Sequence, residues 1–277
     1  VDTGFKYLSV APYGQPPYAT GVVGREEELA AVDAFLTAAP AGPQALLLEG
    51  EAGMGKTTLW QAAVRGARER SYEVLECRPA EAEARRSFSG LEALLAAHLD
   101  ARDCLPPPQR RALEIALRLR DAGTTAPGAR AIGLGVLGVL RLLASTQTVV
   151  LAIDDAELLD AASAAALTFA LQRLGTEPVS LVAARKPGGA TALRLDRFVR
   201  QPVGPLSLGA LHRLLQDRLE TVFPRRQIVG MHRVSGGNPF VALEIARMGL
   251  TLSDAERPLA PTRMEELIQA RLAPLPS

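Results

Sequence analysis

Residues 50–58 read Gly50-Glu51-Ala52-Gly53-Met54-Gly55-Lys56-Thr57-Thr58. The run matches the pattern G-x-x-x-x-G-K-[ST], in which glycines allow successive backbone N–H groups to turn toward an anion. A short apolar run, Ala45 to Leu48, precedes it, and a helix-like stretch, Leu59 to Val64, follows it. Because this order puts the loop between a strand and the positive N-terminal end of a helix, it predicts a phosphate-binding loop. A glycine-rich turn that meets the pattern by chance is the alternative.

The phosphate-loop pattern assigns different roles to two of its residues. Lys56 supplies a mobile positive charge for the β- and γ-phosphates of a nucleotide, and the Thr57 hydroxyl is a ligand for Mg²⁺. The residues expected to bind the nucleotide here are Gly50, Ala52, Gly53, Met54, Gly55, Lys56, Thr57 and Thr58.

An acidic pair supports this prediction. Residues 148–153 form a continuous apolar run, typical of a strand buried on both faces, and the run ends in Asp154-Asp155. Open α/β sheets bind ligands at the carboxyl ends of their strands. We therefore expect Asp154 to share Mg²⁺ with Thr57, and Asp155 to orient or activate the attacking water, with Glu157 as an alternative for the second role. A helix N-cap and turn is the other interpretation of the pair.

Three further residues outside the loop are candidates. Arg185 ends the next apolar run, 179–184, so its guanidinium should face the phosphate pocket and contact the γ-phosphate, unless it is a surface arginine. Arg25 follows Gly24 before the first expected helix, where an exposed residue of the first turn is the plain interpretation. Pro239 follows Asn238, which is typical of a helix start.

Strands and helices alternate through most of the chain. We expect strands at 45–48, 72–77, 148–153, 179–184 and 201–203, and helices at 25–38, 59–64, 88–99, 109–121, 130–145 and 160–174. This alternation predicts an α/β fold with a parallel sheet covered on both faces. From Leu206 onward only helical patterns occur. The expected parts are therefore an arm at 1–20 (flexible or an added extension), a nucleotide-binding core at 21–205 and a smaller helical domain at 206–277.

Composition excludes several function classes. The chain has 277 residues with 48% hydrophobic content, which is enough for a large core. Its formal net charge is +1, so it lacks the excess of positive charge that is typical of proteins that bind nucleic acid or an anionic membrane. Its two cysteines indicate a reducing compartment. Its three histidines are scattered along the chain, which argues against a metal site built from histidine. The longest apolar stretch, 131–144, is too short to span a bilayer, and no secretory signal is visible. We expect a cytoplasmic protein.

The motifs together resemble a known family, the nucleotide-binding domain of STAND-type P-loop ATPases, in particular the large LuxR-family (LAL or MalT-like) transcription regulators. The residues that carry the resemblance are Val23 to Leu29, Gly50 to Thr57, Ser87-Phe88 with Leu91, Leu151 to Asp155 with Asp160 and Ser163, Arg185, and Gly237 to Phe240. They match in order and spacing from about Gly21 onward. One departure is Glu157-Leu158, where relatives often carry His-Trp.

The resemblance implies a P-loop NTPase fold of the ASCE type, with a five-stranded parallel sheet of order 5-1-4-3-2 and a C-terminal helical lid. It implies that Gly24 and Arg25 lie near the adenine, that Arg185 senses the γ-phosphate, and that Pro239 packs on the nucleotide and couples it to domain closure. It favours ATP and ADP as ligands, with Mg²⁺.

The expected function is that of an ATP-binding, slowly hydrolysing switch domain in a signal-transduction or transcription regulator, in which ATP·Mg²⁺ closes the lid and promotes self-association. The resemblance implies that DNA is contacted through a C-terminal domain outside these 277 residues, and that no membrane is involved. Two alternatives stay open: an ATPase or phosphotransferase with real turnover, and an initiator-like ATPase that binds DNA directly. The arginines that suggest the last are Arg213, Arg218, Arg225, Arg226 and Arg233.

Overall fold

A computed structural model describes residues 21–82, 84–121, 127–189, 193–194 and 198–247. The predicted arm at 1–20 lies outside the described residues, as does the end of the helical region from 248 onward. The chain divides into two compact units, Val1–Gly204 and Pro205–Ser277, which are described separately below.

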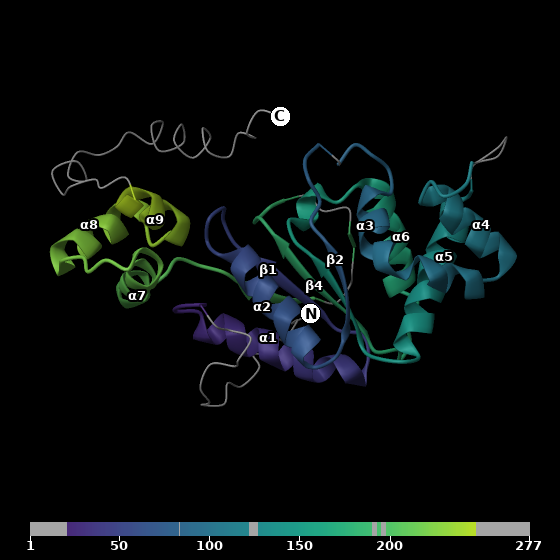
Figure 1. Ribbon diagram of the computed structural model, residues 1–277, viewed down its shortest axis with the longest axis horizontal. Helices are drawn as coiled ribbons and strands as arrows, with labels where there is room; N and C mark the ends of the chain where they lie inside the picture. Colours follow the sequence, from purple (N-terminus) through teal and green to yellow (C-terminus); the bar gives the residue numbers. More distant parts are fainter. Residues whose placement is uncertain (1–20, 83, 122–126, 190–192, 195–197, 248–277) are drawn as a thin grey trace, which may run out of the picture. The chain divides into compact units, whose positions relative to one another are not determined.

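The first unit is built on one five-stranded sheet (Figure 1). Its strands are β1 (Ala45–Glu49), β2 (Glu73–Cys77), β3 (Val149–Ile153), β4 (Val179–Arg185) and β5 (Val199–Pro202). Their order in the sheet is β2-β3-β4-β1-β5, and every pairing is parallel. This is the predicted order 5-1-4-3-2 read from the other edge, so the expected fold class is confirmed.

Helices cover both faces of the sheet, because side chains alternate along each strand. Leu46 and Leu48 of β1 pack with α1 (Glu26–Ala38) and α2 (Lys56–Glu69), whereas Leu47 packs on the opposite face with α3 (Ser89–Leu95), α5 (Ala129–Ala144) and α6 (Ala161–Leu171). The helix α4 (Pro107–Ala116) packs against α5, on the side of α5 that faces away from the sheet (Figure 1). The central strands β3 and β4 are buried on both faces, as their continuous apolar sequences predict.

Some element boundaries differ from the prediction. The helix expected at 88–99 ends at Leu95 and continues as a 3-10 segment, Ala96–Cys104. The helix expected at 109–121 begins earlier, because Pro107 occupies its first turn, where a missing N–H costs no hydrogen bond. The last strand begins at Val199 rather than at residue 201.

The second unit has a small core of its own among its described residues. It contains α7 (Leu208–Leu219), α8 (Arg225–Ser235) and α9 (Pro239–Arg247). Their buried apolar residues are Leu206, Ala210, Leu211, Leu215, Ile228, Met231, Ala242 and Ile245. The Asn238 side chain accepts hydrogen bonds from the amides of Phe240 and Val241, so Asn238-Pro239 does start a helix.

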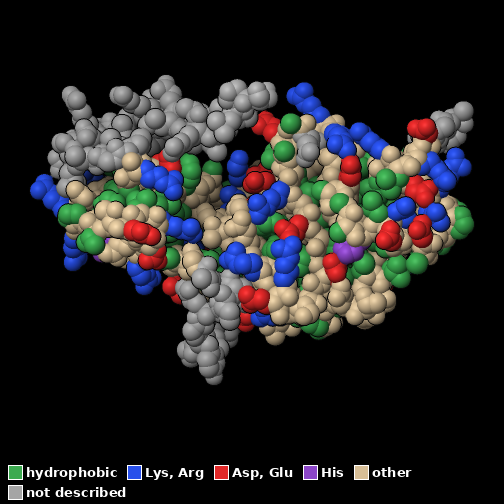
Figure 2. Space-filling view, viewed as in Figure 1, with side chains coloured by type: hydrophobic (Ala, Val, Ile, Leu, Met, Phe, Trp, Pro, Cys, Tyr) green, Lys and Arg blue, Asp and Glu red, His purple; other side chains and the backbone are tan. Residues whose placement is uncertain are grey.

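The surface in the orientation of Figure 2 carries both signs of charge. Lysine and arginine side chains are interspersed with acidic ones over the described residues of this face, in keeping with the formal net charge of +1. Among the described residues, none of the helices is long and apolar enough to cross a membrane.

Candidate phosphate-binding site

The predicted phosphate loop connects β1 to α2, and two of its glycines are required for different reasons. Gly55 has φ of +92° and stands immediately before α2, and a Cβ atom there would meet nothing within 4 Å. Glycine is therefore needed for its left-handed backbone, and the space beside it is open. A Cβ atom on Gly50 would lie 2.4 Å from the carbonyl oxygen of Val203. Gly50 is therefore needed for close approach of two backbone segments.

Lys56 is the first residue of α2, and its ammonium group stays with the loop. The side chain is buried, and Nζ donates a hydrogen bond of 3.1 Å to the carbonyl oxygen of Glu51. A phosphate held by the loop would be a stronger, charged acceptor for the same group. The predicted contact of Lys56 with the β- and γ-phosphates stays a prediction.

Thr57 and Asp154 come together across the loop and the end of β3. The Thr57 hydroxyl donates to the Asp154 carboxylate, which also accepts a bond of 3.2 Å from the amide of Asp155. Burial raises the pKa of the Asp154 carboxyl, because its side chain is only 4% exposed, and the neighbouring Asp155 charge adds to the rise. A buried carboxylate beside a hydroxyl oxygen suits a hard divalent cation, since the cation would compensate the buried charge. The residues fit Mg²⁺, and Thr57 and Asp154 would be its protein ligands.

Asp155 adopts a left-handed backbone, with φ of +46°, before the short 3-10 segment Ala156–Leu158. Aspartate tolerates this conformation better than most residues, although at some cost. Glu157, the alternative for water activation, has both carboxylate oxygens buried with no hydrogen-bond partner among the described residues. Activation of the attacking water by Asp155, with Glu157 as the alternative, stays a prediction.

Arg185 lies at the base of the phosphate loop, but its guanidinium already has a partner. Nε and Nη2 lie 3.0 and 2.9 Å from Oε1 of Glu49, the last residue of β1. The two residues are opposite each other in the β1–β4 register, and the amide of Gly50 donates to the Arg185 carbonyl. Glu49 is not among the residues predicted from the sequence, because its pairing with Arg185 depends on the register of β1 against β4.

Arg25 is not an exposed residue of the first helical turn, so that interpretation is wrong. Its side chain is buried, at 6% exposed, and its guanidinium donates to the carbonyl oxygens of Met54 and Gly204 and to the Glu28 carboxylate. Gly24, with φ of +66°, turns the chain just before it. The predicted contacts of Gly24 and Arg25 with adenine stay predictions.

Arg78 is a second residue that sequence analysis missed. It directly follows β2, whose last residue, Cys77, pairs with Ile153 just before Asp154. Its guanidinium carbon lies 4.6 Å from the centre of the Trp60 ring, and its charge opposes the rise in the pKa of Asp154. Arg78 therefore adds positive charge beside the Thr57–Asp154 pair.

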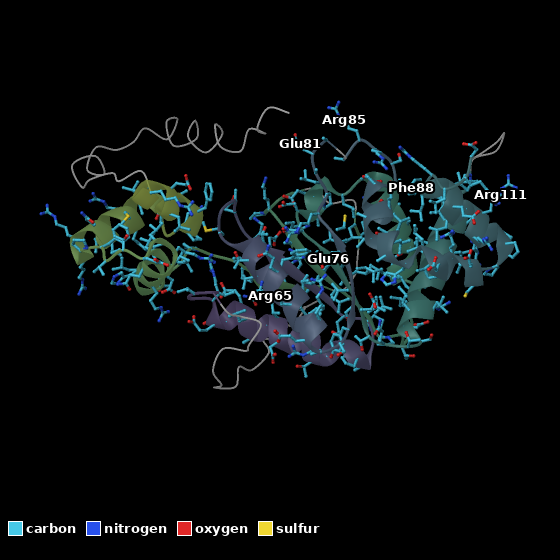
Figure 3. All side chains as sticks on the ribbon, in the orientation of Figure 1. Arg65, Glu76, Glu81, Arg85, Phe88 and Arg111 are labelled. Atoms are coloured by element: carbon cyan, nitrogen blue, oxygen red, sulfur yellow. The ribbon has the colours of Figure 1, made fainter. Side chains whose placement is uncertain are left out.

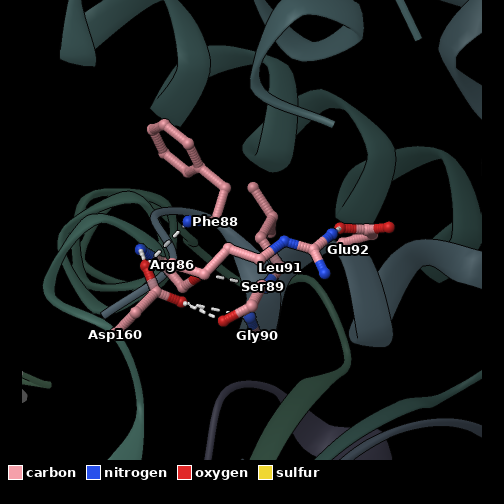
Figure 4. Close-up of polar contacts among 8 residues, drawn as sticks. Arg86, Phe88, Ser89, Gly90, Leu91, Glu92 and Asp160 are labelled. Atoms are coloured by element: carbon pink, nitrogen blue, oxygen red, sulfur yellow. Dashed lines mark hydrogen bonds and ion pairs between the residues drawn. The ribbon is translucent and has the colours of Figure 1, made fainter. Parts of the chain in front are cut away.

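The Ser87-Phe88 segment and Asp160 form a structural junction rather than part of the phosphate site. Figure 3 labels Phe88 at the start of α3, and Figure 4 shows Asp160 accepting bonds from this turn. The Asp160 carboxylate accepts from the amides of Phe88 at 2.8 Å, Gly90 at 3.0 Å and Ser163 at 2.9 Å. It therefore caps α6 and holds the start of α3 at the same time.

Pro239 is the first residue of α9, in the second unit. Its local surroundings are those of an ordinary helix start, and its predicted contact with nucleotide stays a prediction.

Comparisons with known proteins agree with this geometry. The sequence matches the family model described as an AAA ATPase domain over residues 21–182. Drosophila ORC bound to DNA has a similar structure, with a TM-score of 0.52 and 17% identity, covering 90% of this chain and 67% of that chain. At this level of identity the likeness shows a shared fold.

Two further solved structures are similar at a lower level. RuvB from Thermotoga maritima has a TM-score of 0.49 and 17% identity, covering 92% of this chain and 72% of that one. The ORC1 protein of Aeropyrum pernix in complex with DNA has a TM-score of 0.49 and 19% identity, covering 94% and 71%. No curated protein matches the sequence significantly. The family model spans more than half of the 277 residues and includes the phosphate loop and Asp154, and this chain therefore belongs to the AAA ATPase domain family.

Proposed function

We propose that this chain is an ATP·Mg²⁺-dependent switch that hydrolyses ATP slowly. The observation that carries the proposal is the hydrogen bond between Thr57 and Asp154, which joins the residue after Lys56 in the phosphate loop to the end of β3. A phosphate chain in the loop would meet the backbone N–H groups, the Lys56 ammonium and the N-terminal end of α2. Mg²⁺ held by Thr57 and Asp154 would neutralise charge on the β- and γ-phosphates.

The ATP- and ADP-bound forms would differ in the contacts that only a γ-phosphate makes. We assign this contact to Arg185, because it is the last residue of β4 and its carbonyl oxygen accepts a hydrogen bond from the amide of Gly50. In the structure its guanidinium pairs with Glu49, and a γ-phosphate would compete with that carboxylate for it. A ligand shifts a conformational equilibrium only by its differential affinity for the two states, and exchange of Arg185 between Glu49 and phosphate supplies such a difference.

The finer assignment rests on the resemblance to STAND-type regulators of the LuxR family. Under it, the second unit is a lid that closes over ATP with Pro239 against the nucleotide, and closure permits self-association of the chain. DNA would be contacted by another domain of the full regulator. The motif set from Gly24-Arg25 to Asn238-Pro239 supports this assignment.

Nucleotide binding is tested first. Protein purified and then denatured should release ADP or ATP, identified by ion-exchange chromatography. In titration calorimetry, Lys56→Ala should weaken ATP binding by more than about tenfold, since it removes a charge-assisted contact to phosphate. The matched control is Arg111→Ala, which removes one positive charge from an exposed position on α4 (Figure 3). Equal affinity for ATP in the wild type and in Lys56→Ala would exclude the loop as the binding site.

A turnover ATPase is the second candidate, and Asp155 beside the Asp154 carboxylate favours it. In that case steady-state phosphate release should be fast and should be lost in Asp155→Asn. Slow release that Asp155→Asn leaves unchanged would favour the switch.

A further inference from the structure

We infer that Arg25 is a positioning residue that couples the phosphate loop to the segment leading into the second unit. The inference rests on the proposed nucleotide binding, and it assigns Arg25 a task other than contact with the nucleotide. One nitrogen of its guanidinium, Nη2, donates 2.8 Å to the carbonyl oxygen of Met54 and 2.7 Å to that of Gly204. The first acceptor belongs to the phosphate loop, and the second is the last residue of the first unit.

The Arg25 side chain is built into the fold as a bridge. Its other terminal nitrogen, Nη1, donates 2.7 Å to Glu28, which compensates the buried charge. A buried guanidinium needs partners for its donors, and these three acceptors fix its plane. Arg25 therefore cannot shift toward one carbonyl without loosening its bond to the other.

The bond to Met54 orients the phosphate loop itself. In a trans peptide the carbonyl oxygen and the following N–H point in opposite directions, and no cis peptide occurs among the described residues. By holding the Met54 carbonyl, Arg25 turns the N–H of Gly55 away from itself. That N–H belongs to the N-terminal end of α2, where phosphate is expected. A phosphate bound there would stabilise the same peptide orientation.

A second contact joins the loop to the same segment. The Val203 amide donates a hydrogen bond of 2.7 Å to the Glu49 carbonyl oxygen. The Val203 carbonyl oxygen lies 2.4 Å from the position that a Cβ of Gly50 would take. The segment is thus joined directly to the start of the phosphate loop by Val203, and through Arg25 to Met54 by Gly204. Nucleotide occupancy should therefore stabilise this segment, and Arg25 should transmit the effect from the Met54 side.

Amide hydrogen exchange at Val203, followed by NMR with and without Mg²⁺ and ADP, tests the inference. In the wild type, saturating ADP should slow this exchange by about fivefold or more, in the range of ordinary coupling between sites. In Arg25→Met, ADP measured by calorimetry should still bind through Lys56, but the slowing should fall below about twofold. Exchange within β3 serves as an internal reference, and Glu28→Gln, which keeps both carbonyl contacts, should retain the wild-type response.

The outcomes separate the two proposals. No ADP binding by the wild type would remove the proposed function. Binding without any change at Val203 in the wild type, or a full response in Arg25→Met, would overturn the role of Arg25. If Arg25→Met does not fold, Arg25→Lys gives the same comparison. Lysine keeps the positive charge, but it has a shorter overall reach and no planar fork, so this variant too should lose the response.

Discussion

Under the proposed function, the Glu49–Arg185 pair would influence how strongly this site prefers ATP over ADP. Both side chains are largely buried, at 21% and 15% exposed, so the pair is less screened than one on the surface. The Glu49 carboxylate binds the Arg185 guanidinium, and it would repel a γ-phosphate held nearby. We predict that Glu49→Gln tightens ATP binding by about fivefold, or roughly 1 kcal/mol, and changes ADP binding less, as measured by calorimetry.

The control for Glu49→Gln is Arg185→Ala, which should reduce the preference for ATP over ADP. In the double variant the gain in ATP affinity from Glu49→Gln should vanish, because the effects of substitutions at residues in direct contact are not additive. An equal gain with and without Arg185 would mean that Glu49 acts by repulsion alone.

We predict that the ionised Asp154 carboxylate lowers the stability of the folded protein. Because burial raises its pKa in the folded state above the unfolded value, its contribution favours folding at low pH and is lost as pH rises through the folded pKa. Asp154→Asn removes the buried charge and can still accept from Thr57. We expect Asp154→Asn to unfold at a temperature about 2–4 °C higher than the wild type at pH 7. Because the variant lacks the carboxylate proposed to bind Mg²⁺, its affinity for ATP should no longer depend on Mg²⁺. A lower melting temperature at pH 7 would contradict this account.

At the scale of elements, Asp160 ties two helices together. Burial alone would raise its pKa, but hydrogen bonds from Ser163, Gly90 and Phe88 outweigh burial and lower it. Asp160→Ala removes the cap of α6 and leaves the buried amide of Gly90 without its acceptor. We predict a loss of about 2–4 kcal/mol in the free energy of unfolding, measured in urea.

Ser207→Ala is the matched comparison, because the Ser207 side chain caps only α7 with one bond of 3.2 Å. It should cost about 1 kcal/mol. The pH dependence of the free energy of unfolding gives a second check on Asp160, because its lowered pKa in the folded state stabilises the protein at neutral pH. That stabilisation is lost as the pH falls from the ordinary pKa of aspartate through the pKa of Asp160 in the folded state. Asp160→Asn should therefore flatten the loss of stability in acid.

The sequence allowed prediction of elements whose causes are local. The apolar runs of β3 and β4 and the loop between β1 and α2 needed only neighbouring residues. The strand order came with the family resemblance. The pairing of Glu49 with Arg185 depends on sheet register, and the two carbonyl acceptors of Arg25 lie 29 and 179 residues away along the chain. Such contacts follow from tertiary packing, which no local pattern encodes.

At the scale of the whole molecule, the two units can be observed separately with one natural probe. The chain has a single tryptophan, Trp60, which is fully buried in α2 of the first unit. Its fluorescence reports unfolding of the first unit, whereas helical circular dichroism reports both. Because each unit has its own core, we predict that the two signals give different thermal transitions without nucleotide.

Nucleotide should bring the two transitions together if the second unit closes over it. At 100 times its dissociation constant, a ligand that binds only the folded state stabilises it by about 2.7 kcal/mol, so the Trp60 transition should move upward. Under the proposed lid role, ATP·Mg²⁺ should also make the circular dichroism curve coincide with the fluorescence curve, because the second unit would then contribute contacts to the bound state. Lys56→Ala should show neither change. If the Trp60 transition moves while the second unit still unfolds separately, nucleotide binding belongs to the first unit alone, and Pro239 has no part in it.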